Sequence, residues 1–401
     1  MFAAFSVPNF RRYVAGQSLS LVGTWVETVA QALLVLRLTH SGTILGLTTA
    51  ARYAPLLLLS PYAGLLVDRL SKRRVLLATQ SGLGLVSAIL GVSVLTGSVR
   101  LWQVVVLAVV FGMFSAVDNP ARQAFVQEMV GHDLVRNAVT LNSTFVNVAR
   151  VLGPTIAAVL VRTVGLGWCF VANAVSFGFV LVSLLSLDTH ALHPSSPVHR
   201  ARGQFRAGLR YAASISSIIR PLLMMALIGI FAFEFEVSLP LLAEKTFHGD
   251  ETTYSRLLAA LGAGAVAGGL YTAYAGRTGV KRLTKAAVAF GIAIGLVAVA
   301  PGVATAIVAC ALTGAASIVF LTTGNATVQL ASEPDYRGRV TALWSTALVG
   351  STAIGSPIIG ALSDAAGARY ALLLGSAGCF CAAVIGGRHA GAAVSRAPTG
   401  Q

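Results

Sequence analysis

Several charged residues lie inside long apolar stretches of the sequence, where a charge is costly. They include Glu27, Arg150, Glu234 and Glu236. A carboxylate held away from water can exchange a proton near neutral pH or bind a cationic group. An arginine in the same surroundings needs an anion or backbone carbonyls as partners. These residues indicate proton exchange or recognition of a charged ligand, unless the acids serve only as structural partners of Arg52, Arg150 or a gap in a helix backbone.

The composition places most of the chain in a lipid bilayer. The 401 residues are 56% hydrophobic and 11% charged, and the mean hydropathy is +0.78. Soluble domains contain about 25% charged residues, and disordered chains have few apolar ones, so both classes are excluded. The net charge of +15 occurs in short clusters between apolar runs, whereas nucleic-acid-binding proteins gather it on one face. We expect an integral membrane protein with no nucleic-acid partner.

We predict an all-α membrane protein with twelve transmembrane helices in two six-helix bundles. A spanning helix needs about 20 predominantly apolar residues. The expected spans are 12–38, 43–67, 75–96, 101–122, 138–161, 165–187, 221–243, 254–275, 284–300, 304–329, 340–363 and 369–387. The longest connection divides the chain into an N-terminal bundle (1–187), a cytoplasmic linker with a basic amphipathic helix (188–220), and a C-terminal bundle with a short tail (221–401).

The distribution of Lys and Arg predicts the orientation. With both termini in the cytoplasm, 21 of the 29 Lys and Arg residues lie on the cytoplasmic side and six lie outside. This asymmetry is typical of membrane proteins, whose cytoplasmic loops are enriched in cations. The 25-to-4 excess of Arg over Lys indicates a GC-rich bacterial genome. We therefore expect a multi-pass protein of the bacterial plasma membrane, the inner membrane, with cytoplasmic termini.

The two halves of the chain show weak similarity to each other at an offset of about 200–210 residues. Gly153-Pro154 in the fifth span matches Ser356-Pro357 in the eleventh at an offset of 203, and Asn119 precedes Asn325 by 206 residues. Six-plus-six parallel repeats are typical of a transporter architecture with its substrate site near the middle of the bilayer.

The sequence offers no catalytic, metal or cofactor site. The four cysteines lie in apolar runs without metal-ligand spacing, and no phosphate-binding loop is present. We expect a protein that is not an enzyme, that carries no metal or cofactor, and that ATP does not drive.

Several motifs resemble the major facilitator superfamily. The segment Gly64-Leu-Leu-Val-Asp68-Arg69-Leu-Ser71-Lys72-Arg73-Arg74 is similar to its signature between helices 2 and 3, with Ser71 in place of the usual glycine. Asp118-Asn-Pro-Ala-Arg122-Gln-Ala-Phe125 and Arg150-Val-Leu-Gly153-Pro154 resemble one branch, the drug and siderophore exporters related to the enterobactin exporter and the macrolide efflux proteins. The resemblance covers residues 9–387.

The resemblance implies roles for particular residues. It implies a central cavity lined by spans 1, 4, 7 and 10. The candidates for coupling or substrate contact are Glu27, Gln31, Arg150, Glu234, Glu236 and Asn325. The implied gate consists of Gly64, Asp68, Arg69, Lys72, Arg73, Asp118 and Arg122, in which Lys72 or Arg73 pairs with Asp118. The expected hinge residues are Gly153, Pro154 and Pro357. The fourth span lacks the arginine that many proton antiporters of this superfamily carry.

We therefore predict a secondary active transporter that works by alternating access. The leading function is proton-coupled export of an amphipathic small molecule, such as a drug, an antibiotic or a siderophore-like natural product. The expected partners are the lipid bilayer, the small-molecule substrate and protons, and the protein is expected to be a monomer. Two alternatives stay open: a metabolite importer or uniporter, and a non-transporting membrane sensor or scaffold.

Overall fold

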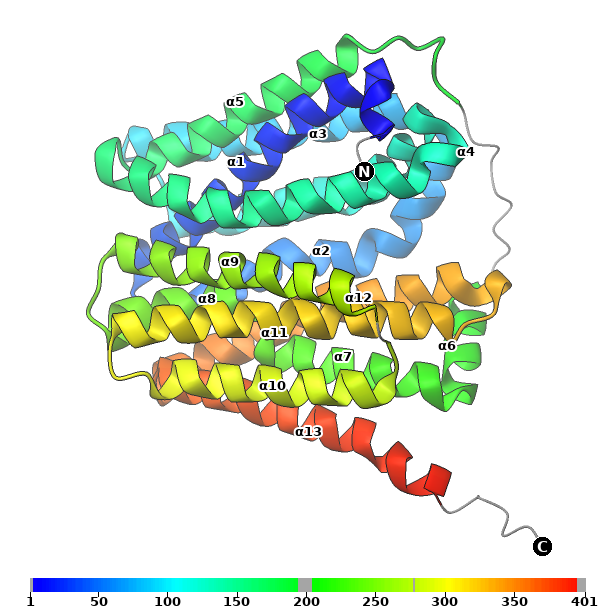
Figure 1. Ribbon diagram of the computed structural model, residues 1–401. Coiled ribbons are helices and arrows are strands. Elements are labelled where there is room, and N and C mark those ends of the chain that lie inside the picture. Colours follow the sequence, from blue (N-terminus) through cyan, green and yellow to red (C-terminus); the bar gives the residue numbers. More distant parts are fainter. Residues whose placement is uncertain (1–2, 194–203, 277, 395–401) are drawn as a thin grey trace, which may run out of the picture. The chain divides into compact units, whose positions relative to one another are not determined.

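The computed structural model describes residues 3–193, 204–276 and 278–394. This part of the chain forms helices and no strand, as Figure 1 shows. Twelve of its helical segments are long and apolar enough to cross a membrane. The predicted fold class and the number of spans are therefore confirmed.

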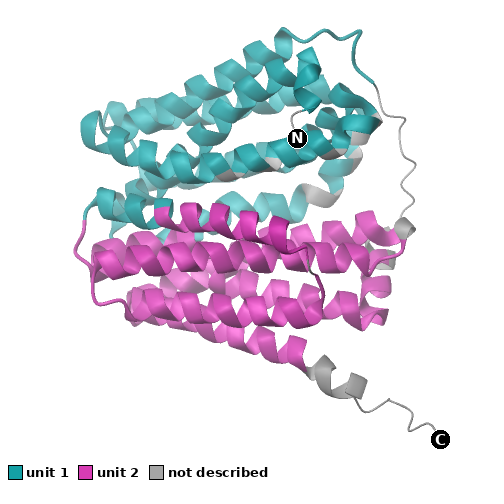
Figure 2. Cartoon of the chain, in the orientation of Figure 1, with its two compact units in different colours: residues 1–200, 250–259 teal, residues 201–249, 260–401 magenta. Residues whose placement is uncertain are grey.

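The chain divides into two compact units, shown in Figure 2: residues 1–200 with 250–259, and residues 201–249 with 260–401. The first part of the chain contains η1 (Ala3–Ser6), α1 (Pro8–Thr39), α2 (Gly42–Arg69), α3 (Lys72–Leu95), α4 (Leu101–Thr163) and α5 (Leu166–Leu185). The second part contains α6 (Gln204–Ser214), α7 (Ser216–Ala232), α8 (Phe235–Leu241), η2 (Leu242–Thr246), α9 (Glu251–Ala275), α10 (Val280–Val299), α11 (Val303–Leu330), α12 (Pro334–Ala365) and α13 (Ala368–Val394).

The long helix α4 carries two of the predicted spans, and the chain bends sharply between them at Gly131. This glycine has φ 68° and ψ 175°, a conformation that residues with a side chain rarely adopt. The bend separates the segments Leu101–Gly131 and Asp133–Thr163. Gly131 therefore separates two helices within α4, each of which is one span.

The seventh span is interrupted, although the sequence predicts one helix over 221–243. The backbone leaves helical geometry at Phe233 and Glu234, and α8 begins immediately afterwards. The carbonyls of the last turn of α7 are approached by glycines of two neighbouring helices: a Cβ at Gly375 would lie 2.7 Å from the Phe231 carbonyl oxygen, and one at Gly355 would collide with the Ile230 carbonyl. The break thus follows directly after the turn of α7 whose backbone is in close contact with α12 and α13.

A compact apolar core lies where η1, α1, α3, α4 and α5 meet in the first unit. Its largest members are fully buried side chains, and Tyr13 packs edge-on against Phe125 with 5.9 Å between ring centroids. Phe10, Met129 and Leu184 belong to the same cluster. Burying each large apolar side chain stabilises the fold by roughly 1.5–3 kcal/mol. This core supports the buried charged residues of the gate.

Candidate transport and gating residues

Glu27 lies inside the first unit, in a closed cluster of polar side chains. It is 2% exposed. Its carboxylate accepts a hydrogen bond from the Ser87 hydroxyl of α3 and a second, 2.6 Å long, from the Asn173 amide of α5. The Ser176 hydroxyl in turn donates to Asn173 Oδ1 at 3.0 Å. The cluster therefore ties α1 to both neighbouring helices, as buried polar groups must be satisfied.

Arg150 does not form the pairing with Glu27 that the sequence leaves open. Its guanidinium lies over the indole ring of Trp25, 5.3 Å from the centroid, in a cation–π arrangement. Gly153 packs against the same tryptophan so closely that a Cβ there would collide with the Trp25 side chain. Trp25 is thus one of the residues through which α1 contacts the second segment of α4, and the partners of Glu27 are Ser87 and Asn173.

A buried arginine of α2 also has a defined partner in the first unit. Arg52 of α2 donates to Gln31 Oε1 of α1 at 2.7 Å, and its guanidinium lies 4.1 Å from the centroid of Phe111. Both Arg52 and Gln31 are 8% exposed. The side-chain oxygen of Gln31, a candidate cavity residue, therefore accepts a hydrogen bond from Arg52.

Glu234 lies at the break between α7 and α8 and is 3% exposed. Its carboxylate accepts a hydrogen bond from the Ser356 hydroxyl of α12. Glu236 is half-buried two residues further on and interacts electrostatically with Glu234. Two acidic residues therefore lie two positions apart in the chain at an interrupted membrane helix, and irregular backbone of this kind commonly lines a binding site in transporters.

Asp118 is the centre of a hydrogen-bond network between α3 and α4. Its side chain is 1% exposed, and its Oδ2 lies 2.9 Å from the guanidinium of Arg122. Thr79 and Gln80 each donate to its other oxygen at 2.8 Å. Three partners thus satisfy this buried carboxylate, one of them the gate residue Arg122.

The expected pairing of Lys72 or Arg73 with Asp118 is wrong. Lys72 Nζ lies 3.4 Å from Oε1 of Glu128. Arg73 donates to the carbonyl oxygens of Leu184 at 2.8 Å and Leu185 at 3.3 Å. These carbonyls are at the C-terminal end of α5, where cations are favoured and backbone acceptors have no partner within the helix. Lys72 therefore binds α4 and Arg73 binds α5, while Asp118 forms its ion pair with Arg122.

The remaining gate residues lie at the end of α2. Arg69 is the last residue of that helix and is exposed, and Gly64 is partly buried. Asp68 is part of the α2 backbone, but its side chain lies outside the described residues. Its role as a latch therefore stays a prediction.

The hinge candidates and Asn325 lie in uninterrupted helix. Pro154 and Pro357 are inside α4 and α12, while Asn325 accepts a hydrogen bond of 3.0 Å from Gln329 one turn later in α11. The one break in a described span that sequence reasoning missed is at Glu234.

Among residues 3–193, 204–276 and 278–394, no three His, Cys, Asp or Glu side chains gather as a metal site requires.

The linker helix α6 packs against the start of α12, a contact that the sequence analysis missed. Tyr211 stacks on Tyr336 with 3.9 Å between centroids and 8° between ring planes. The Glu333 amide donates to the Tyr211 hydroxyl at 3.0 Å, and the Arg339 guanidinium lies 4.9 Å from the Tyr336 ring centroid. The predicted amphipathic helix is thus attached to the second unit. Residues 194–203 of the linker lie outside the described part of the chain.

The sequence matches the family described as transmembrane secretion effectors over residues 1–396. A staphyloferrin A transporter of Staphylococcus aureus is 30% identical over 245 residues, which make up 59% of this chain and 60% of that protein. The match therefore spans about three fifths of that relative's length. The enterobactin exporter EntS of Shigella boydii is 25% identical over 358 residues, covering 88% of this chain and 85% of that one.

Solved transporter structures share the fold. A bacterial homologue of the human lysosomal transporter Spinster, in an inward-facing and occupied conformation, superposes with a TM-score of 0.76 at 14% identity, covering 97% of this chain and 98% of that one. A D-xylose–proton symporter gives a TM-score of 0.74 at 13% identity, with 95% and 97% covered. At these identities the likeness concerns the fold alone.

Proposed function

The chain belongs to the transmembrane secretion effector family of the major facilitator superfamily, and on that premise we propose that it is a proton-coupled exporter of an amphipathic, siderophore-like small molecule. The observation that carries this proposal is the alignment with an enterobactin exporter along 88% of the chain. The match to a staphyloferrin A transporter supports the same substrate class. The exporter works by alternating access between two membrane faces, as its superfamily does.

The proposed proton carrier is the pair Glu234 and Glu236. Two ionised carboxylates close together repel each other, so such a pair is suited to carrying a single proton. The interrupted helix supports this role, because a backbone that has already left helical geometry can reorganise when the charge beside it changes. Glu27 is the less suitable carrier, since Ser87 and Asn173 hold its carboxylate inside the first unit.

The substrate class can be tested in a bacterial strain that makes enterobactin but lacks its exporter. Expression of this chain should restore release of enterobactin into the medium, measured by chromatography of the culture supernatant. An Asp133→Asn variant, which changes an exposed acid, serves as the matched control. Unchanged intracellular retention of enterobactin, with the protein present in the membrane, would argue against this substrate class.

A further inference from the structure

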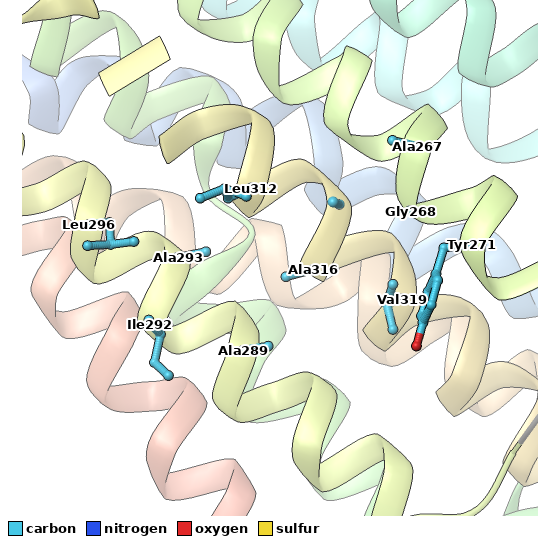
Figure 3. Close-up of a pocket in the computed structure, with 11 residues that line it drawn as sticks. Ala267, Gly268, Tyr271, Ala289, Ile292, Ala293, Leu296, Leu312, Ala316 and Val319 are labelled. Carbon is cyan, nitrogen blue, oxygen red and sulfur yellow. The ribbon is translucent and has the colours of Figure 1, made fainter. Parts of the chain in front are cut away.

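An apolar groove runs along the surface of α9, α10 and α11, and all of its lining residues belong to the second unit. It has a volume of about 460 Å³, which is within the range of about 300–1,000 Å³ that small-molecule sites occupy. Figure 3 shows Tyr271 at one end of the groove and Leu296 at the other. Its lining is apolar apart from the Tyr271 hydroxyl, so the groove fits a hydrocarbon chain.

The groove exists because its floor consists of small residues. Gly268 packs so closely on α11 that a Cβ would collide with the Ala315 carbonyl, and Ala289 and Ala316 add little volume. The rims carry larger side chains, among them Ile292 and Leu312, which are 52% and 51% exposed. Exposed apolar side chains on a membrane-spanning helix face lipid. The groove therefore opens toward acyl chains of the bilayer.

A fixed cation lies at the Tyr271 end of the groove. Arg282 donates to the Tyr271 hydroxyl at 3.3 Å, and its guanidinium lies 5.6 Å from the centroid of the tyrosine ring. On α10, Arg282 precedes the groove residue Ala289 by seven residues, or about 10 Å of helix. Lys281 and Lys285 are exposed on the same turn of α10. Aromatic and basic residues of this kind mark the level of lipid headgroups.

The positive charges at the Tyr271 end of the groove have no acidic residue nearby in the sequence of these helices. Residues 252–332, which include nearly all of the three helices, contain no Asp or Glu. The natural counter-ion of Arg282 is therefore an anion from outside these helices, and a phosphate matches a guanidinium in charge and in hydrogen-bond geometry.

We propose that this groove binds an anionic phospholipid, with one acyl chain between α9 and α10 and the phosphate on Arg282. A second copy of the chain fits less well, because the groove ends at three cations that an identical surface would repel. The lysines attract the anionic headgroup, while Tyr271 lies at the boundary between headgroup and acyl chain. The bound lipid thereby fills the space that the small residues leave open.

Native mass spectrometry of the purified full-length protein tests the proposal independently of transport. The probes are dioleoylphosphatidylglycerol and dioleoylphosphatidylcholine, added in equal amounts. We expect one tightly bound phosphatidylglycerol. Arg282→Gln should raise its dissociation constant by about tenfold, the loss of roughly one charge-assisted contact, and Arg282→Lys should retain part of the preference. Arg11→Gln, which changes an exposed arginine of the first unit, should have no effect.

A groove-filling variant provides the second arm. Ala316→Leu should displace the acyl chain and weaken retention of the lipid, whereas Ala361→Leu, at an exposed alanine of α12, should not. Thermal melting of each variant establishes that it is folded. Equal retention of the two lipids, or unchanged binding in both Arg282→Gln and Ala316→Leu, would overturn the proposal. So would a dimer that Ala316→Leu dissociates, because the groove would then bind a second copy.

Discussion

Lys72 and Glu128 form a nearly buried ion pair, with 3.4 Å between Nζ and Oε1 and side-chain exposures of 10% and 9%. Lys72 is the first residue of α3, and Glu128 lies in α4 shortly before the bend at Gly131. The pair therefore fixes the loop after α2 to the end of the first α4 segment. Next to it, Arg73 holds the last carbonyls of α5, so the basic cluster binds three helices of the first unit together.

Removal of one member of this pair should destabilise the protein. Glu128→Gln leaves the Lys72 ammonium without its counter-ion in a nearly buried site, which costs about 3 kcal/mol or more. The double variant Lys72→Met, Glu128→Met should recover much of the loss, because two apolar side chains replace both charges. Thermal melting in detergent, followed by circular dichroism, measures both effects. Equal melting temperatures for wild type and Glu128→Gln would show that the pair contributes nothing.

Asp68→Asn should slow transport without lowering the amount of folded protein. The residue belongs to the motif that resembles the superfamily gate, and a latch stabilises one conformation rather than the fold. Transport rate and membrane abundance are measured in the same preparation, with Asp133→Asn as the control. A wild-type rate in Asp68→Asn would refute the gating role.

Glu27 should tolerate an amide but not an apolar side chain. Ser87 and Asn173 donate to the same oxygen of Glu27, so in Glu27→Gln the amide oxygen can accept both hydrogen bonds and the two donors stay satisfied. In Glu27→Leu both partners lose their acceptor, and each buried unsatisfied group costs about 1–3 kcal/mol. We expect Glu27→Gln to melt near the wild-type temperature and to keep pH-driven transport, and Glu27→Leu to melt lower. Loss of coupling in Glu27→Gln would instead make Glu27 a proton carrier.

Tyr211 should control the attachment of α6. Tyr211→Ala removes the stacking on Tyr336, a contact of about 0.5–1.5 kcal/mol, while Tyr211→Phe keeps the stack and loses the acceptor for the Glu333 amide. Limited trypsin digestion at the neighbouring Arg210 measures release of the helix. We expect cleavage to be several-fold faster in Tyr211→Ala than in Tyr211→Phe. Equal rates in both variants and in wild type would show that the stack does not hold α6.

The sequence predicts the spans well because their length and hydropathy are local properties. Most partners of the charged residues could not be predicted in this way, because they depend on which helices pack together. Glu128 follows Lys72 by 56 residues, and the two meet only because α3 packs on α4. Asp118 is the opposite case: its partner Arg122 lies one helical turn away in the same helix, and the spacing at i and i+4 was a signal in the sequence that pointed to it.

The break at Glu234 could not be predicted from backbone propensity. No glycine or proline occurs between Gly229 and Pro240, and the prolines expected to act as hinges, Pro154 and Pro357, lie in continuous helix. The break coincides with tertiary contacts: Gly355 and Gly375, which are more than 100 residues further along the chain, approach the backbone carbonyls of α7. Ser356, the neighbour of both Gly355 and Pro357, supplies the hydrogen bond to Glu234.

Uptake into inverted membrane vesicles tests proton-coupled export most directly. With a pH gradient that is acidic inside, wild-type protein should concentrate a fluorescent amphipathic dye or enterobactin in the vesicle lumen. The double variant Glu234→Gln, Glu236→Gln should abolish this concentration while it still permits exchange of substrate down its own gradient. Asp133→Asn should behave as wild type. Continued accumulation in the double variant under the same gradient would contradict coupling through this pair of carboxylates.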